Sequence, residues 1–359
     1  MRKTSAVILS IMLFAGLLIS GSLAEKTKPE IVTSGEWKYR LLEDGTAAIE
    51  QYDGSAEEVV IPPELDGKTV TGLAQSSFEN HKGMVSVTIP DSLMRIEKNP
   101  FYFCEKLNTI HVSPDNPYLA VIDGVLFSKP DKKLVCFPAA AGLREYSIPN
   151  GIRVIGEYAF YGCNSLTGVT IPDSVTGIGE TAFCKCTSLE SITIPDGVTG
   201  IDNGVFNGCQ SLKSIVIPDT VTSIGSRAFR RCISLENITI PDGVTDIGNG
   251  AFMDCRSLET VTIPGSVWSI RRDAFASCES LKSVVILDGV SVIGDFAFAG
   301  CANLKSVTIP DSVMAIGKDV FGDCSQLTLT VNRDSLAAQF CKEFNLNYTY
   351  PDSNDWLND

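Results

Sequence analysis

One sequence unit of 23 residues returns along most of this 359-residue chain. Its markers are a phenylalanine, a cysteine three positions later and a leucine three positions after that. Phenylalanine occurs at 160, 183, 206, 229, 252, 275, 298 and 321, with cysteine and leucine at the matching offsets. A fixed period of this length is typical of a solenoid, in which each unit packs only against its neighbours. The repeat therefore predicts one elongated domain.

The unit that begins at Leu189 shows how one repeat is expected to fold. Leu189, Ile192 and Ile194 match the L-x-x-L-x-L core of a leucine-rich repeat, and alternation of Ile192 and Ile194 is the period of a half-buried strand. Pro195 lacks an N–H and ends the strand, and the Asp-Gly after it predicts a turn. We therefore expect a β-rich α/β solenoid, a leucine-rich repeat array of 23-residue coils with a parallel sheet.

The other segments are expected to lead into, interrupt or close this array. Residues 1–24 have a basic start, an apolar stretch and a small-residue cleavage site, which predict a signal peptide, with an uncleaved anchor as the alternative. We expect a flexible leader over 25–36 and an N-terminal β-hairpin cap over 37–58. The solenoid is expected over 59–327, with an irregular insert at about 105–147. A C-terminal cap of helix and strand is expected over 328–350, and a tail over 351–359.

Composition limits the possible partners. The net charge is −14 and the isoelectric point is about 4.7. Strong acidity argues against binding to nucleic acid and to anionic membranes. Beyond residue 24 the sequence has no second long apolar stretch. We expect a monomer that does not insert into membranes in its mature form.

The repeat resembles that of the BspA-like leucine-rich repeat proteins, which are found mostly on bacterial surfaces. The resemblance rests on the unit Ser-Leu-x-Ser-Val/Ile-Thr-Ile-Pro-Asp-x-Val-x-x-Ile-Gly-x-x-Ala-Phe-x-x-Cys. The opening over 37–52, the interruption over 116–126 and the cap at 334–337 support it, and it covers roughly residues 35–350. It implies a secreted or cell-surface protein whose partners are extracellular or host-surface proteins. Members of the family are linked to adhesion, including to fibronectin and fibrinogen.

Twelve cysteines in a secreted chain would ordinarily suggest disulfides. Nine of them, Cys104 and the eight in the 23-residue series, fall in one predicted column. Neighbouring parallel strands hold Cβ atoms about 5 Å apart, whereas a disulfide needs about 3.8 Å. We therefore expect nine buried free thiols, packed as small apolar groups. Zinc is disfavoured because thiols in a row do not surround a point. For Cys136, Cys184 and Cys341 a pair remains open.

Other reactive residues do not form a recognisable catalytic set. His81 replaces a column cysteine and is expected to be structural, and His111 is expected to face outward from a strand. An aspartate follows the strand proline in most units. It could bind Ca²⁺, but it is more typical of a side chain that holds its own turn. We predict no catalytic residue, no metal and no cofactor, and hence no enzyme.

Two surface features are candidate binding sites. Outward strand positions form a polar sheet that suits a protein or a glycan: Ser191, Thr193, Ser214, Asn237, Thr239, Thr260 and Thr262. Separately, Arg271 and Arg272 replace the usual Gly-x beside Trp268, and an aromatic next to arginines is enriched in binding hot spots. The prediction is a non-catalytic protein-binding or adhesion module, with a slight preference for the sheet as the binding surface. The alternative is an envelope structural or spacer protein without a specific ligand.

Overall fold

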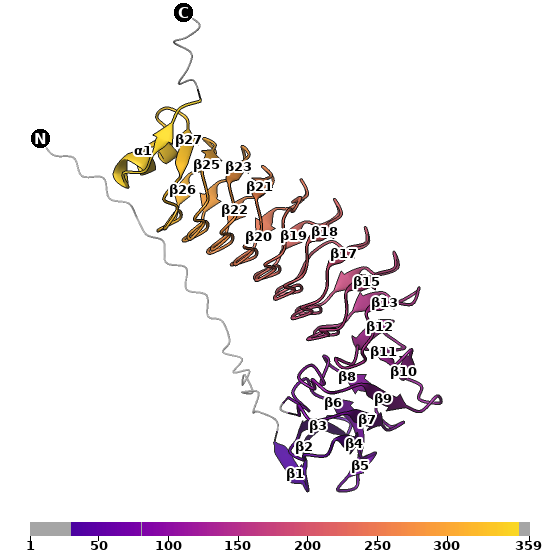
Figure 1. Cartoon of the computed structure of the whole chain (residues 1–359). Coiled ribbons are helices and arrows are strands. Elements are labelled where there is room, and N and C mark those ends of the chain that lie inside the picture. The colour runs from indigo at the N-terminus through magenta and orange to yellow at the C-terminus, as the bar shows by residue number, and fades with distance from the viewer. Residues whose placement is uncertain (1–29, 80, 352–359) are drawn as a thin grey trace, which may run out of the picture.

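A computed structural model describes residues 30–79 and 81–351. The predicted signal peptide, the start of the leader and nearly all of the tail lie outside the described residues. Figure 1 shows one curved array of coils, from the purple N-terminal strands to the yellow C-terminal helix. The predicted solenoid of 23-residue coils is therefore confirmed.

Each regular coil contributes strands to two parallel ladders. The long ladder contains β13 (Glu145–Ser147), β15 (Gly168–Thr170), β17 (Ser191–Thr193), β18 (Ser214–Val216), β21 (Thr260–Ile263), β23 (Ser283–Ile286), β25 (Ser306–Ile309) and β27 (Thr328–Val331). The short ladder contains β14 (Val154–Ile155), β16 (Gly177–Ile178), β19 (Ser223–Ile224), β20 (Asp246–Ile247), β22 (Ser269–Ile270), β24 (Val292–Ile293) and β26 (Ala315–Ile316). Residues 23 positions apart pair in register, so equivalent side chains form columns.

The long ladder is interrupted at one coil. Asn237 makes a single bridge to Thr260, and Thr239 lies outside any strand. The ladder therefore consists of two blocks, β13 to β18 and β21 to β27. The predicted parallel sheet is therefore interrupted at this coil.

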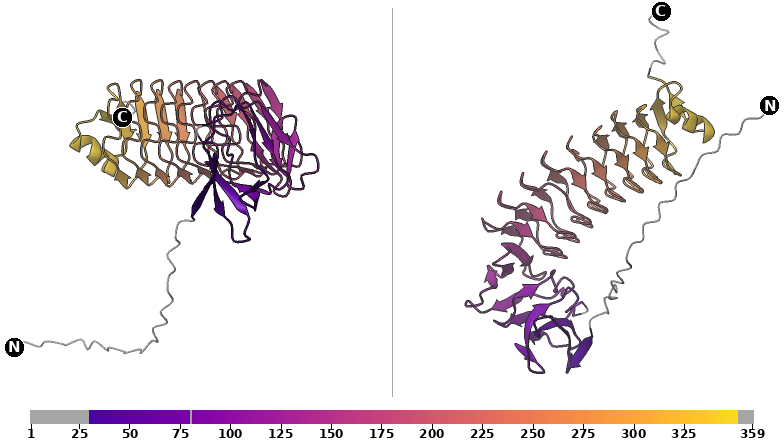
Figure 2. Two further views of the ribbon diagram at one scale, coloured as in Figure 1. Left: turned by 90° about the horizontal axis from the view of Figure 1, so that it is seen from below. Right: turned by 180° about the vertical axis from the view of Figure 1, so that it is seen from behind.

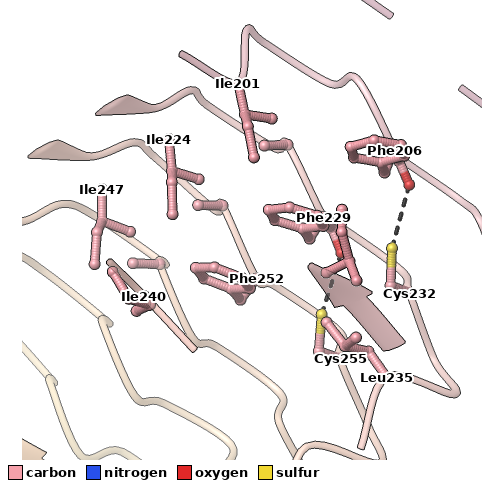
Figure 3. Packing of buried hydrophobic residues seen from close by; sticks show 14 of the residues in the cluster. Ile201, Phe206, Ile224, Phe229, Cys232, Leu235, Ile240, Ile247, Phe252 and Cys255 are labelled. Carbon is pink, nitrogen blue, oxygen red and sulfur yellow. Dashed lines mark hydrogen bonds between the residues drawn. The ribbon is translucent and has the colours of Figure 1, made fainter. Parts of the chain in front are cut away.

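A column of phenylalanine rings fills the core (Figure 3). From Phe160 to Phe321 the ring centroids are 4.8–5.8 Å apart, and the ring planes differ by only 7–12°. Phe137 extends the column, because its ring stacks on Phe160 at 5.2 Å. It stands one 23-residue step earlier, a position that the sequence analysis overlooked.

The return segment of each coil is also hydrogen-bonded to the next coil. The Phe229 N–H donates to the Ala251 carbonyl at 2.7 Å, and the Phe252 N–H donates to the Ala274 carbonyl at 2.7 Å. These bonds form a third connection beside the two ladders. Every coil therefore depends on its neighbours, as expected for one-dimensional packing.

Strands cover the N-terminal end of the array (Figure 2). A sheet joins β1 (Ile31–Ser34), β2 (Trp37–Leu41), β3 (Ala47–Tyr52), β6 (Lys68–Leu73) and β5 (Glu64–Leu65), and β8 (Arg95–Ile96) pairs with β6. The β2–β3 hairpin is as predicted. However, β1 pairs along its whole length with β2, in a stretch expected to be a flexible leader.

The remaining strands lie before and within the expected insert, and the C-terminal end carries the predicted helix and strand. Before and within the insert lie β4 (Glu58–Val60), β7 (Ser86–Ile89), β9 (Thr109–Val112), β10 (Leu119–Ile122), β11 (Val125–Ser128) and β12 (Lys133–Cys136). The buried residues form two clusters that divide at this insert. At the far end, α1 (Leu336–Glu343) starts at the N-cap Ser335, and β28 (Tyr348–Thr349) pairs with β27.

Candidate functional site

The cysteine column is a hydrogen-bonded ladder of free thiols. From Cys186 to Cys324, each thiol lies 3.0–3.3 Å from the carbonyl oxygen of the phenylalanine 26 residues earlier and donates to it. Figure 3 shows two of these contacts, Cys232 to Phe206 and Cys255 to Phe229. All twelve cysteines are free. The prediction of purely apolar packing was incomplete, because each thiol also joins two coils.

Burial makes the thiols of Cys104 and Cys232 poor nucleophiles. It raises the pKa of Cys104 to about 12 and holds the pKa of Cys232 well above its ordinary value. A thiolate is the reactive form of cysteine, and it is scarce in such surroundings. The column therefore belongs to the core rather than to a reactive site.

The same pKa shift predicts alkaline destabilisation. The folded pKa of Cys104 lies above the unfolded value near 9.0, so its contribution to stability is complete below pH 9 and is lost as the pH rises toward 12. Replacing Cys104 with alanine should flatten the fall in unfolding free energy above pH 9 by up to about 1.4 kcal/mol per pH unit. Urea titrations from pH 7 to 10.5 measure this slope. Parallel curves for the two proteins at every pH would contradict the prediction.

The remaining polar candidates are structural. His81 is buried, and its Nε2 lies 2.8 Å from the Ala56 carbonyl oxygen, whereas His111 is exposed on β9, as predicted for both. No hydrogen bond joins the aspartate after each strand proline to its own turn in the described coils, so that expectation was wrong. The next side chain instead ties coils together, as Thr220 does by donating to the Val198 carbonyl. Among the described residues, no cluster of histidine, cysteine or acidic side chains is placed to hold a metal ion.

The polar sheet is exposed but less uniform than predicted. Ser191 and Ser214 are paired and exposed on neighbouring strands, and Thr260 and Thr262 are exposed on β21. The column of Thr193 also contains exposed Val216 and Val285. Asn237 and Thr239 are exposed as well, although their coil adds no regular strand to the long ladder.

The second candidate lies beside a groove over the short ladder. Its volume is about 530 Å³, and its lining includes Trp268, Arg271, Arg272, Val292, Gly294, Asp295, Ala315 and Gly317. The Trp268 side chain is 63% exposed, and Met314, two coils further along the same column, is 71% exposed. The structure therefore brings the three predicted residues Trp268, Arg271 and Arg272 to one hollow surface with apolar side chains beside it.

Arg271 occupies a column in which the other coils of this region carry glycine. A Cβ atom built on Gly317 would lie 2.5 Å from the backbone nitrogen of the preceding coil, so glycine allows the coils to approach closely there. Gly248 and Gly294 each donate to the preceding coil at 2.8 Å, whereas the Arg271 N–H donates to the Ile247 carbonyl at 3.2 Å. Of these three hydrogen bonds, the one from Arg271 is the longest.

Both arginines are held by acidic neighbours. The Arg271 Nε donates to Asp246 at 2.8 Å, and the Arg272 Nε donates to Asp273 at 3.2 Å. The Arg272 guanidinium also lies over the Phe296 ring, 5.2 Å from its centroid. These contacts fix the two guanidinium groups at the edge of the groove.

Sequence reasoning missed the floor of the groove. The residues of the floor occupy ordinary repeat positions, so the sequence pattern did not single them out: Val292, Gly294, Ala315 and Gly317. The sequence does hint at this floor through the contrast with Arg271. One column carries a large side chain at Arg271 and then two glycines, and the space without side chains forms the hollow. Met314, where other coils carry threonine or serine, was a further sign.

Comparisons with known proteins identify the repeat. A family model described as a BspA type leucine-rich repeat region matches residues 52–129, 133–256 and 199–328. No curated protein matches in sequence, and no enzyme family is indicated. Within the described ranges, no helix has both the length and the apolar character needed to cross a bilayer.

Solved structures of bacterial leucine-rich repeat proteins are similar. A protein from Eubacterium ventriosum has 20% identity and a TM-score of 0.60, over 74% of this chain and 93% of that one. A leucine-rich cell surface protein from Faecalibacterium prausnitzii has 28% identity and a TM-score of 0.46, over 92% and 97%. One from Bacteroides ovatus has 22% identity and a TM-score of 0.47, over 89% and 99%. Since the family model covers more than half of its residues, the chain belongs to the BspA-type leucine-rich repeat family.

Proposed function

We propose that this protein is a secreted or surface-associated, non-catalytic binding module whose partners are extracellular or host-surface proteins. The main observation in support is the groove at Trp268. An exposed aromatic, two anchored arginines and an apolar floor together match the composition of protein interfaces, which concentrate binding energy in buried aromatic and arginine anchors. Departure from the glycine column at Arg271 adds support, because natural proteins break local rules mainly at functional sites.

Saturable binding is the first test. The mature chain, passed over purified host matrix proteins that include fibronectin and fibrinogen, should bind at least one with a defined plateau in surface plasmon resonance. Weak uptake that never saturates with any of them would favour the alternative, an envelope spacer protein without a specific ligand.

Substitutions decide between the groove and the polar sheet. Trp268→Ala should weaken binding to that partner by about 30-fold or more, the equivalent of about 2 kcal/mol for a hot spot. Thr262→Arg places a bulky charge on the outward face of β21, and it should change affinity less than threefold. Loss with Thr262→Arg and tolerance of Trp268→Ala would place the partner on the sheet instead.

Arg271→Gly separates stability from binding. Glycine restores the residue that other coils use, so the unfolding free energy should stay within about 1 kcal/mol of the parent or rise, although glycine costs roughly 0.5–1 kcal/mol in chain entropy. Binding should weaken at least tenfold. Urea unfolding and surface plasmon resonance on the same preparation give both values, and an equal loss in both would mean that Arg271 serves the fold alone.

A further inference from the structure

A cleft separate from the Trp268 groove lies where the insert meets the N-terminal strands. Its volume is about 360 Å³, and β8 forms one wall through Arg95 and Ile96. The open end of the β10–β11 hairpin forms the other wall (Figure 1). The rest of the lining comes from residues next to these elements: Met94, Glu97, Tyr118, Leu119, Ser128, Pro130 and Asp131.

A regular coil shows how a short strand uses the edge that faces the next coil. The Ile201 N–H donates to the Ser223 carbonyl at 3.0 Å, and the Ile201 carbonyl accepts from the Gly225 N–H at 2.7 Å. The Thr199 carbonyl accepts in the same way from the Thr222 N–H at 2.9 Å. The strand thus presents an acceptor, a donor and a second acceptor to its neighbour.

The three equivalent groups of β8 have no partner within the protein. Ile96 pairs with Leu73 of β6, and it is the Glu97 N–H that donates to the Leu73 carbonyl. The Met94 carbonyl and the N–H and carbonyl of Ile96 therefore face the opposite edge. Across the part of the chain that the structure describes, no hydrogen bond reaches any of the three. The next short strand along the chain, β12, pairs with β14 on one edge and with β11 on the other, so it does not cover β8.

Charge does not select a ligand for this cleft. Each charged side chain of the lining lies near an opposite charge: Arg95 near Asp44 at 3.8 Å, Glu97 near Arg40 at 2.9 Å and Asp131 near Lys133 at 3.9 Å. The unpaired groups belong to the backbone, and Ile96, Tyr118 and Leu119 add apolar surface beside them. An extended polypeptide brings backbone donors and acceptors at the matching spacing, as in other cases of strand addition at a sheet edge.

We infer that this cleft binds an extended, uncharged segment of a partner polypeptide, which pairs with β8 as an added strand. The segment donates to the carbonyls of Met94 and Ile96 and accepts from the Ile96 N–H. These two carbonyls belong to residues about 7 Å apart along a strand, so about three residues of the partner lie in the cleft. The inference goes beyond the proposed function, because it assigns a second binding surface that reads the backbone of its ligand.

Matched peptides test this inference. The probe is a fluorescently labelled octapeptide of alternating threonine and valine, blocked at both ends, together with the same peptide N-methylated on its central residues. In fluorescence anisotropy with the full chain, the unmodified peptide should bind saturably and about tenfold or more tightly than the N-methylated one, because N-methylation removes the donors to Met94 and Ile96. Equal binding of the two peptides, or no binding of either, would overturn the inference.

Two substitutions on the insert test the position of the added strand. Pro130 is exposed and lines the cleft, so Pro130→Trp should obstruct it and weaken binding of the unmodified peptide by about tenfold or more. Ile122, at the far end of the same hairpin, is also exposed but does not line the cleft, so Ile122→Trp should leave binding unchanged. Equal effects of the two substitutions would place the peptide elsewhere and overturn the inference.

Hydrogen–deuterium exchange gives a readout that needs no substitution. With saturating unmodified peptide, added protection should appear in fragments that cover residues 94–97, since the Ile96 N–H gains an acceptor. Protection confined to other coils would contradict strand addition at β8.

Discussion

Replacing Phe229 with alanine should lower the free energy of unfolding by about 3–5 kcal/mol. The Phe229 ring is fully buried and stacks between Phe206 at 5.4 Å and Phe252 at 5.2 Å, so alanine leaves a cavity in the middle of the column. The surrounding coils cannot close around it, because the short ladder and the hydrogen bonds of the return segments fix their spacing. Urea unfolding followed by circular dichroism measures the loss.

The end of the column supplies the matched control. Phe321 is 7% exposed and stacks on a single phenylalanine, Phe298, at 5.8 Å. Phe321→Ala should therefore cost clearly less than Phe229→Ala. Equal losses at the two positions would mean that stacking between neighbouring coils contributes little to stability.

Removal of the N-terminal strands should cause aggregation. Deleting residues 30–52 removes β1, β2 and β3. Of these, β3 pairs with β6, and the three strands pack over the buried residues Val70 and Phe78. The exposed apolar coil and the unpaired edge of β6 would then be free to associate with other chains. Size-exclusion chromatography should show soluble aggregates or loss of the protein.

Deleting one internal unit is the control for that change. Removing residues 210–232 joins Cys209 to Ile233 and preserves the 23-residue pattern, so the new neighbours meet equivalent columns. This shortened array should remain monomeric and cooperative in unfolding. If both deletions reduced solubility equally, the opening strands would not be a cap.

Much of this fold could be predicted because the repeat is so regular. Residues 23 apart must occupy equivalent places, so the pattern of Leu189, Ile192 and Ile194 was enough to predict the parallel strands and their inward face. The C-terminal helix carries a separate local signal, because Ser335 is its N-cap. These features depend on local chemistry or on the period, and both are visible in the sequence.

Other features depend on contacts that no local pattern reveals. The strand at Ile31–Ser34 forms because it pairs with β2. Its four residues are too few to distinguish a strand from a polar leader in the sequence. Likewise, a cysteine at a buried repeat position predicts only apolar packing. Its hydrogen bond to a carbonyl 26 residues earlier becomes visible only when the stacking of the coils is known. Ile238 has strand-forming neighbours, yet its coil adds no regular strand to the long ladder, and nothing in the structure explains that break.

Only part of the groove could be predicted from the sequence, for the same reason. Trp268, Arg271 and Arg272 are conspicuous in the sequence because they depart from the repeat. The hollow beside them exists because Gly294 and Gly317 have no side chains, and these two glycines follow the repeat. A residue that departs from the repeat can be recognised directly in the sequence. The groove beside it depends on how three coils stack, which the sequence does not show.

Hydrogen–deuterium exchange in the presence of a saturating matrix-protein partner tests the central claim most directly, because it locates the partner on the array without a substitution. We predict that added protection concentrates in peptides covering residues 268–272 and 291–317, and that β17, β18 and β21 exchange as they do in the free protein. Protection spread along the long ladder, with no change at Trp268 and its neighbouring coils, would contradict the groove as the binding site.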